Sequence, residues 1–123
     1  MQKILIIEDD KDIKDAVQTH LVSKGYNVRT AESSEEGLKL VMETKPDLIL
    51  LDIMTRSLHG SVFVERLRNL PPGKNDSKVI IFTNLDNDMS KNKFAGSDVA
   101  GYLIKAEVSL EQIADKVSEV LGS

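Results

Sequence analysis

The sequence predicts an α/β fold, in which one doubly wound, five-stranded parallel sheet carries five helices distributed over both of its faces. Two observations lead to this prediction. Five short apolar runs alternate along the chain with segments of helical period. Most of these runs are apolar throughout, which is typical of strands covered on both sides of a parallel sheet. The 123 residues suffice for one compact unit, so a single domain is expected over residues 1–123.

The predicted strands are short. Four of them are mainly aliphatic, whereas the second alternates with polar residues and suits an edge of the sheet. In chain order they occupy residues 4–7, 26–30, 47–51, 79–82 and 101–104.

The segments between the strands carry helical signals. Asp10 is expected to cap the first helix. Ser33 with Glu36, and Ser109 with Gln112, form capping-box patterns ahead of the second and the last helix. The buried stripes are expected at Ile13, Ala16, Val17, His20 and Leu21, at Leu38, Val41 and Met42, at Phe63, Val64, Leu67 and Leu70, and at Leu110, Ile113, Ala114, Val117 and Leu121. A fourth helix is expected around residues 88–96.

Charge and composition exclude several classes of function. The 16 basic and 20 acidic residues are interspersed, without the basic stripe or the aromatic platform of a nucleic-acid binder. The chain has no cysteine, which excludes disulfides and thiolate metal sites. No apolar run approaches the ~20 residues of a membrane span, and the first apolar run is too short for a signal peptide. We therefore expect a cytoplasmic protein that neither contacts nucleic acid directly nor inserts into a membrane.

Polar residues follow four of the predicted strands at their carboxyl ends. Glu8 and Asp9 follow the first strand, Asp52 the third, Thr83 the fourth and Lys105 the fifth. Ligands of open α/β sheets bind beyond these ends, so we expect the side chains to converge. Two carboxylates ~4 Å apart repel by roughly 4 kcal/mol at an effective dielectric near 20, so the cluster needs cations. A hard divalent ion, Mg²⁺, and the ammonium of Lys105 fit that need, and Thr83 can donate to a phosphoryl oxygen.

These motifs resemble the response regulator receiver domains of two-component phosphorelays, in particular the single, chemotaxis-type receivers, over essentially the whole chain. The similar stretches are ILIIEDD, DLILLDIM, IIFTN and GYLIK. The resemblance implies a flavodoxin-like fold with strand order 2-1-3-4-5. It also implies a phosphoryl donor, either a histidine kinase or a histidine phosphotransfer protein, and a downstream output protein or domain. No enzymatic activity is expected beyond reactions of the domain's own aspartyl phosphate, and a phosphorylation-dependent homodimer is compatible with the resemblance.

The resemblance assigns a metal role to four positions. Asp9 corresponds to the main metal carboxylate, and Glu8 would act largely through a metal-bound water. Asp52 and the backbone carbonyl of Met54 would complete the protein ligands of Mg²⁺.

The resemblance likewise assigns the phosphoryl chemistry and the switch. Asp52 corresponds to the phosphoacceptor, and Thr83 and Lys105 would contact the phosphoryl group. On phosphorylation Thr83 would move toward the phosphate and Tyr102 would turn inward. That movement would change the face formed by the fourth helix, the fifth strand and the fifth helix.

Two positions in the loops of the site depart from the family pattern. Arg56 stands where receivers usually carry a proline, and Ala106 stands where a cis proline commonly follows the lysine. A cis bond without proline costs ~3 kcal/mol or more. The sequence therefore predicts either a strained cis Lys105–Ala106 bond or a trans bond with a re-routed loop.

A third departure concerns access of water. Asn84 replaces the small residue that usually follows the threonine. Together with Met54 and Leu85, it is expected to limit the water that reaches an aspartyl phosphate, which predicts slow self-dephosphorylation.

Other functions fit parts of the pattern. A phosphatase of the haloacid dehalogenase type needs an aspartate two residues after its nucleophile, where this chain has Met54. A flavodoxin-like mononucleotide binder cradles phosphate after the first strand, where the acids of this chain would repel it. Taken singly, Glu8 and Asp9 are compatible with helix capping, Thr83 with local backbone bonds, and Tyr102 with edge-strand packing. A degenerate receiver that acts only as a protein-interaction module stays open as the alternative.

Overall fold

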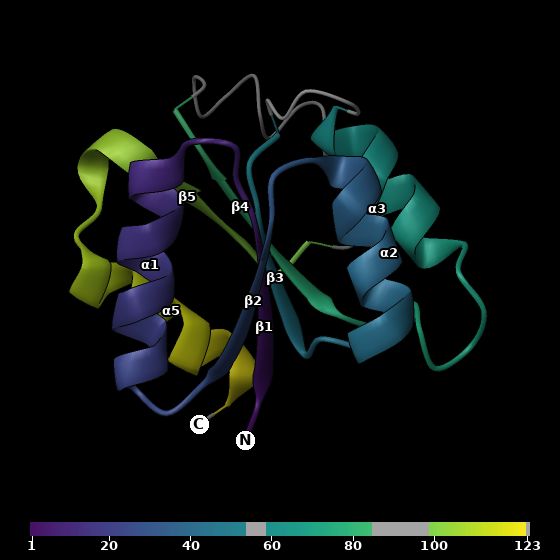
Figure 1. Ribbon diagram of the computed structural model, residues 1–123, viewed down its shortest axis with the longest axis horizontal. Helices are drawn as coiled ribbons and strands as arrows, with labels where there is room; N and C mark the ends of the chain where they lie inside the picture. Colours follow the sequence, from purple (N-terminus) through teal and green to yellow (C-terminus); the bar gives the residue numbers. More distant parts are fainter. Residues whose placement is uncertain (54–58, 85–98, 123) are drawn as a thin grey trace.

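Five parallel strands form one sheet in the order β2-β1-β3-β4-β5 in the computed structural model of the chain (Figure 1). The structure describes residues 1–53, 59–84 and 99–122. The strands are β1 (Lys3–Ile7), β2 (Asn27–Ala31), β3 (Leu48–Leu51), β4 (Lys78–Thr83) and β5 (Gly101–Ile104). The predicted strand order is confirmed, and every strand begins and ends within one residue of its predicted position.

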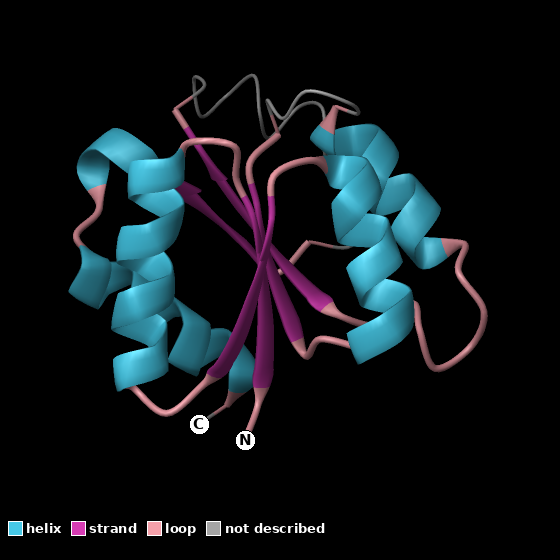
Figure 2. Ribbon diagram, in the orientation of Figure 1, coloured by secondary structure: helices cyan, strands magenta, loops and turns pink. Residues whose placement is uncertain are grey.

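Helices cover both faces of the sheet, as Figure 2 shows. One face carries α1 and α5, and the other carries α2 and α3. Their bounds are α1 (Lys11–Ser23), α2 (Ser34–Thr44), α3 (Gly60–Arg68) and α5 (Leu110–Leu121), with a short 3₁₀ helix η1 (Lys105–Glu107) after β5. The described part of the chain thus contains four of the five expected α-helices. The helix predicted around residues 88–96 lies outside the described residues.

Successive side chains of the central strands pack into two separate hydrophobic cores, one on each face of the sheet. In β1, Ile4 and Ile6 pack into the core beneath α1 and α5, while Leu5 and Ile7 pack into the core beneath α2 and α3. All four side chains are at most 1% exposed. Because side chains alternate between the faces of a sheet, a strand with a core on each side is apolar throughout.

The predicted caps form, except that the Ser33–Glu36 box is only half made: Ser33 accepts from the Glu36 N–H, while the Glu36 carboxylate accepts from the Glu32 N–H. Asp10 caps α1 by accepting a hydrogen bond from the Ile13 N–H at 3.1 Å. Ser109 and Gln112 form a complete capping box at the start of α5. The described helices include none that is both long and apolar enough to cross a membrane.

Three positions of the predicted buried stripes were wrong. Ala16 and Met42 are exposed, although Val17 and Val41 beside them are buried. Consecutive residues of a helix are rotated by about 100°, and in these two pairs the valine faces the core while its neighbour faces solvent. The third, Leu110, is 38% exposed because it is the first residue of α5, one turn ahead of the core.

A buried lysine, Lys14, occupies one position of the buried stripe of α1. Lys14 is 9% exposed, and its Nζ reaches Glu32 Oε1 at 3.2 Å. A long side chain can bury its stem while the ammonium stays at the surface, so a charged residue fills a core-facing position of the helix.

Candidate functional site

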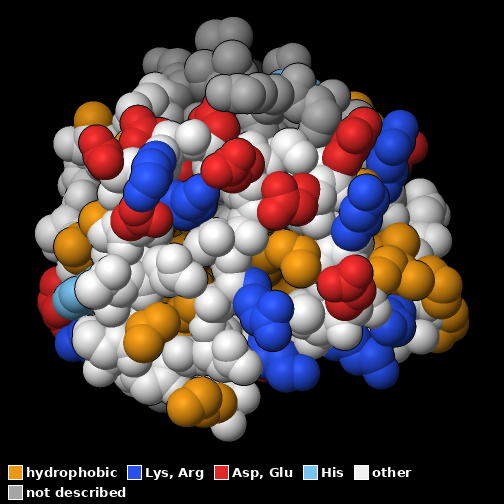
Figure 3. All heavy atoms as spheres, in the orientation of Figure 1, with side chains coloured by type: hydrophobic (Ala, Val, Ile, Leu, Met, Phe, Trp, Pro, Cys, Tyr) orange, Lys and Arg blue, Asp and Glu red, His pale blue; other side chains and the backbone are white. Residues whose placement is uncertain are grey.

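The register of the sheet brings predicted site residues together at its carboxyl edge, at the top of Figure 1. Ile7 of β1 pairs with Leu51 of β3, so Glu8 and Asp52 leave adjacent strands at the same level. The Asp52 N–H donates to the Ile7 carbonyl at 3.0 Å, which ties the two strand ends together. On the face drawn in Figure 3, acidic side chains gather toward this edge.

Three carboxylates form the acidic part of the site. Glu8, Asp9 and Asp52 each offer an oxygen, and these oxygens lie within 4.8 Å of one another. Glu8 is fully buried and Asp52 is 5% exposed, whereas Asp9 faces solvent. Two unit charges at that distance repel by about 3.5 kcal/mol at an effective dielectric of 20. The cluster therefore depends on cations.

Lys105 supplies one cation from the structure itself. Its Nζ lies 3.0 Å from Asp52 Oδ2 and also contacts Glu8 Oε2. The same ammonium lies 5.3 Å from the centroid of the Phe82 ring, within the range of a cation–π contact. The lysine side chain is only 10% exposed. A single ammonium thus bridges two of the three carboxylates.

Burial and the ion pairs together shift the pKa values of Glu8 and Lys105. Burial raises the pKa of Glu8, against the opposing hydrogen bonds from Lys105 and from the Asp10 N–H, and the charge of Asp52 raises it further. Burial by itself would lower the pKa of Lys105. The hydrogen bonds and charges of Glu8 and Asp52 outweigh that effect and hold the pKa of Lys105 above its ordinary value. The lysine therefore stays charged in the site.

The Lys105–Ala106 peptide bond is trans, as are the other peptide bonds of the described residues. Of the two predicted peptide geometries, trans is the one observed. The chain turns into η1 directly at Lys105, and the Ala106 N–H donates to Asn84 Oδ1 at 2.9 Å. The lysine side chain still reaches Asp52.

The two predicted switch residues lie on neighbouring strands. Thr83 ends β4 and is 2% exposed. Tyr102 lies in β5 beside Ile81 of β4, and its ring packs partly against the core beneath α2 and α3. Burial raises the pKa of Tyr102.

Three residues of the predicted site and its loops lie outside the described residues, namely Met54, Arg56 and Leu85. The carbonyl ligand assigned to Met54 and the slow self-dephosphorylation therefore stay predictions. Two contributors to the site were missed from the sequence: Phe82 beneath the lysine, and the side chain of Asn84 as an acceptor. Residue types alone carry no signal for the Asn84 contact, because its partner N–H lies 22 residues further along the chain.

The donor set fits a hard divalent cation. All three candidate ligands are carboxylates, which suit Mg²⁺ and give no preference to a softer metal. Asp9 is exposed, so this carboxylate is accessible to water. Glu8, Asp9 and Asp52 are thus the described residues that could hold Mg²⁺.

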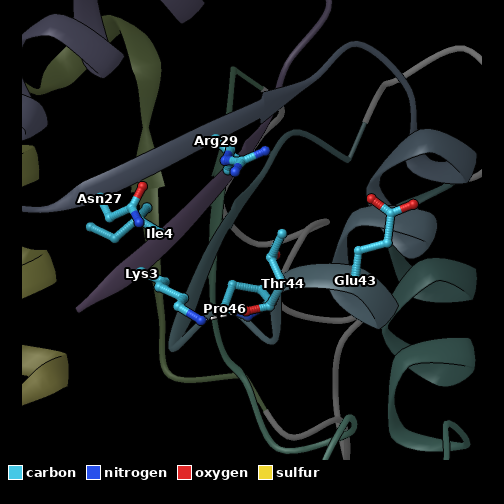
Figure 4. Close-up of a pocket in the computed structure, with 7 residues that line it drawn as sticks. All are labelled: Lys3, Ile4, Asn27, Arg29, Glu43, Thr44 and Pro46. Atoms are coloured by element: carbon cyan, nitrogen blue, oxygen red, sulfur yellow. Dashed lines mark hydrogen bonds between the residues drawn. The ribbon is translucent and has the colours of Figure 1, made fainter. Parts of the chain in front are cut away.

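A hollow at the opposite edge of the sheet is unrelated to these residues. It has a volume of about 280 Å³ and lies at the amino ends of β1 and β2, beside the end of α2 (Figure 4). Lys3 Nζ donates there to the Thr44 carbonyl at 3.1 Å. None of the predicted site residues lines this hollow.

Comparison with known proteins points to one family. The family model of the response regulator receiver domain matches residues 4–118. The transcriptional regulatory protein AfsQ1 of Streptomyces coelicolor is 40% identical over 88 residues, which are 72% of this chain and 37% of that protein. The DNA-binding dual master transcriptional regulator RpaA of Synechocystis sp. is 33% identical over 121 residues, which are 98% of this chain and 49% of that protein. The chain thus spans less than half the length of these two relatives.

Solved structures agree over nearly the whole chain. A CheY-like response regulator receiver domain protein from Methanospirillum hungatei has a TM-score of 0.89 at 27% identity, covering 99% of this chain and 94% of that one. A two-component response regulator from Clostridium difficile has a TM-score of 0.89 at 30% identity, covering 99% and 97%.

Proposed function

Because the chain belongs to the response regulator receiver domain family, we propose that it is a phosphoacceptor module in which Asp52 takes the phosphoryl group of a phosphohistidine. The donor is a histidine kinase or a histidine phosphotransfer protein. One observation carries the proposal: the Lys105 ammonium lies 3.0 Å from Asp52 Oδ2, inside a cluster of three carboxylates at the carboxyl edge. A charged lysine beside an acid is suited to neutralise the phosphoryl oxygens as they arrive.

The proposed transfer exchanges one bond to phosphorus for another. A carboxylate oxygen of Asp52 attacks the phosphorus, the P–N bond to the imidazole breaks, and the leaving nitrogen keeps the electron pair and is protonated from solvent. Lys105 and the hydroxyl of Thr83 would contact the phosphoryl oxygens. Mg²⁺, when bound, supplies further neutralisation of the charge on those oxygens. Glu8, Asp9 and Asp52, with the Met54 carbonyl, would hold it.

The phosphorylated domain would signal through its surface. Thr83 would shift toward the phosphate and Tyr102 would turn inward, changing the face to which β5 and α5 belong. We propose that this face controls a downstream output protein or domain in the cytoplasm, directly or through a phosphorylation-dependent homodimer. Two relatives are named as transcriptional regulators, and one of them as DNA-binding, so control of transcription is the proposed output. The domain catalyses only reactions of its own aspartyl phosphate.

The test is the intact mass of the protein after incubation with Mg²⁺ and acetyl phosphate, a small phosphodonor. We expect the gain of one phosphoryl group in the wild type, and no gain after Asp52→Ala or in the presence of a chelator. Asp115→Ala is the matched control, because Asp115 is an exposed aspartate of α5 outside the carboxylate cluster. It should be phosphorylated like the wild type.

A folded wild type that gains no mass from acetyl phosphate or from a phosphohistidine donor would contradict the proposal. That outcome would favour the alternative, a degenerate receiver that acts only through protein contacts.

A further inference from the structure

We propose that Asn84 is a positioning residue for Lys105. Its side-chain oxygen binds the Ala106 N–H and thereby fixes the main chain from which Lys105 reaches Asp52. This inference rests on the proposed function, because it assigns Asn84 an effect on phosphoryl transfer without contact to the phosphoryl group.

The hydrogen bond lies where the pairing of β4 and β5 ends. Thr83 and Ile104 form the last pair in the register of the two strands. Asn84 and Lys105 come next, and there the chain after β5 turns into η1. The bond from the Ala106 N–H to Asn84 Oδ1, at 2.9 Å, continues the link between the two strand ends beyond their last pair. It joins the residue after Thr83 to the residue after Lys105.

The place of this hydrogen bond matters because the side chain of Lys105 makes several contacts at once. Its Nζ touches Glu8 and Asp52 and lies over the Phe82 ring while its main chain is leaving the sheet. A small rotation of the backbone at Lys105 is amplified along a four-carbon side chain. Misplacement of a catalytic group by about 1 Å can cost as much as 10²-fold in rate. A tether at the next residue limits that rotation.

The interaction also accounts for two departures from the family pattern at once. Proline has no N–H, so this bond requires a residue other than proline at position 106. It equally requires an acceptor side chain at position 84, where a small residue could not reach. Asn84 and Ala106 therefore form one functional unit, although 22 residues separate them in the sequence.

The first arm of the test is the rate of Asp52 phosphorylation by acetyl phosphate at saturating Mg²⁺. Asn84→Ala should lower the rate constant about fivefold, since an ordinary hydrogen bond corresponds to roughly twofold to tenfold in an equilibrium. The apparent Kd for Mg²⁺ should stay unchanged, because the carboxylates are intact, whereas a general disruption of the site would weaken both. Asn69→Ala is the matched control: it removes an exposed asparagine with one side-chain bond, to the Glu65 carbonyl, and should leave the rate unchanged.

The second arm is a double-mutant cycle. Ala106→Pro removes the donor of the bond, so Asn84→Ala should have no further effect on the rate in that background, whatever the rate of Ala106→Pro alone. If Asn84→Ala slows phosphorylation equally in both backgrounds, Asn84 acts through some other contact and the inference is wrong. It is equally wrong if Asn84→Ala leaves the wild-type rate unchanged.

The third arm does not depend on phosphorylation. Hydrogen exchange of the Ala106 amide, followed by NMR without Mg²⁺, should accelerate about fivefold in Asn84→Ala. Unchanged exchange would overturn the inference. A wild type that shows the protected amide but takes no phosphoryl group would instead contradict the proposed function, so the two failures can be told apart.

Discussion

Two clusters of ion pairs among the described residues lie in different surroundings. At the carboxyl edge of the sheet, Lys105 bridges Glu8 and a second carboxylate in a largely buried site. Between α1 and α5, Glu111 accepts a hydrogen bond from Lys24 at 2.8 Å and lies 3.0 Å from His20. There the side chains of Lys24 and Glu111 are 41% and 57% exposed.

The two clusters show how burial decides what an ion pair does. At the carboxyl edge, loss of hydration dominates and raises the pKa of Glu8. At the surface, the hydrogen bond from Lys24 dominates and lowers the pKa of Glu111. Water screens the surface charges, whereas the buried carboxylates depend on the cation that the fold supplies, the ammonium of Lys105. The charges that water screens least therefore lie at the carboxyl edge, where phosphoryl chemistry is proposed.

The largest effect is expected from removing the buried cation. Lys105→Ala leaves Glu8 and Asp52 facing each other without an ammonium, so the free energy of unfolding without Mg²⁺ should fall by about 3 kcal/mol. The rate of phosphorylation by acetyl phosphate should fall about 100-fold, as expected for loss of one preorganised group that stabilises a transition state. Urea denaturation and intact-mass kinetics measure the two effects.

The exposed cluster provides the control for that experiment. Lys24→Ala removes a lysine that also pairs with a glutamate, but both partners are exposed and screened. Its stability should fall only slightly below that of the wild type, and its phosphorylation rate should match that of the wild type. If the two lysine variants behaved alike, burial would not be what distinguishes the clusters.

A smaller effect is expected from adding Mg²⁺, which should act on the buried cluster alone. At a concentration tenfold above its Kd, the ion should stabilise the wild type by about 1.4 kcal/mol, because it binds the folded site and not the unfolded chain. Asp9→Ala should lose most of this gain, and Glu111→Gln should keep it. Thermal melts with and without Mg²⁺ measure the difference, and an equal gain in all three proteins would indicate nonspecific binding.

Much of the fold and part of the site could be predicted from the sequence, for physical reasons that particular residues show. The runs around Ile4 and Leu48 are apolar throughout because both faces of the sheet are covered, so their pattern identifies parallel strands directly. Glu8 and Asp52 follow such runs, and the meeting of parallel strand ends at one edge predicts their convergence.

The remaining features depend on side-chain direction, which periodicity does not encode. Lys14 lies beside Glu32, which follows β2 and is brought there only by the fold. The Ala106 N–H finds its acceptor in the side chain of Asn84, and residue types alone left both peptide geometries open. Such contacts join residues far apart in the sequence and appear only when the strand ends are seen together.

The smallest expected effect concerns pH and belongs to the exposed cluster. The hydrogen bond and charge of Lys24, with a smaller effect of His20, lower the pKa of Glu111, so the folded protein binds a proton at Glu111 less readily than the unfolded chain. Ionised Glu111 therefore contributes stability above pH 4.5, the ordinary pKa of glutamate, and this contribution is lost as the pH falls through the lowered pKa. Thermal melts should place Glu111→Gln slightly below the wild type at pH 7, with the difference between the two proteins shrinking as the pH falls below 4.5. A difference in stability that stayed constant over this range would mean that Glu111 stabilises α5 by packing and not by its charge. The charge effects in the chain would then be limited to the buried cluster.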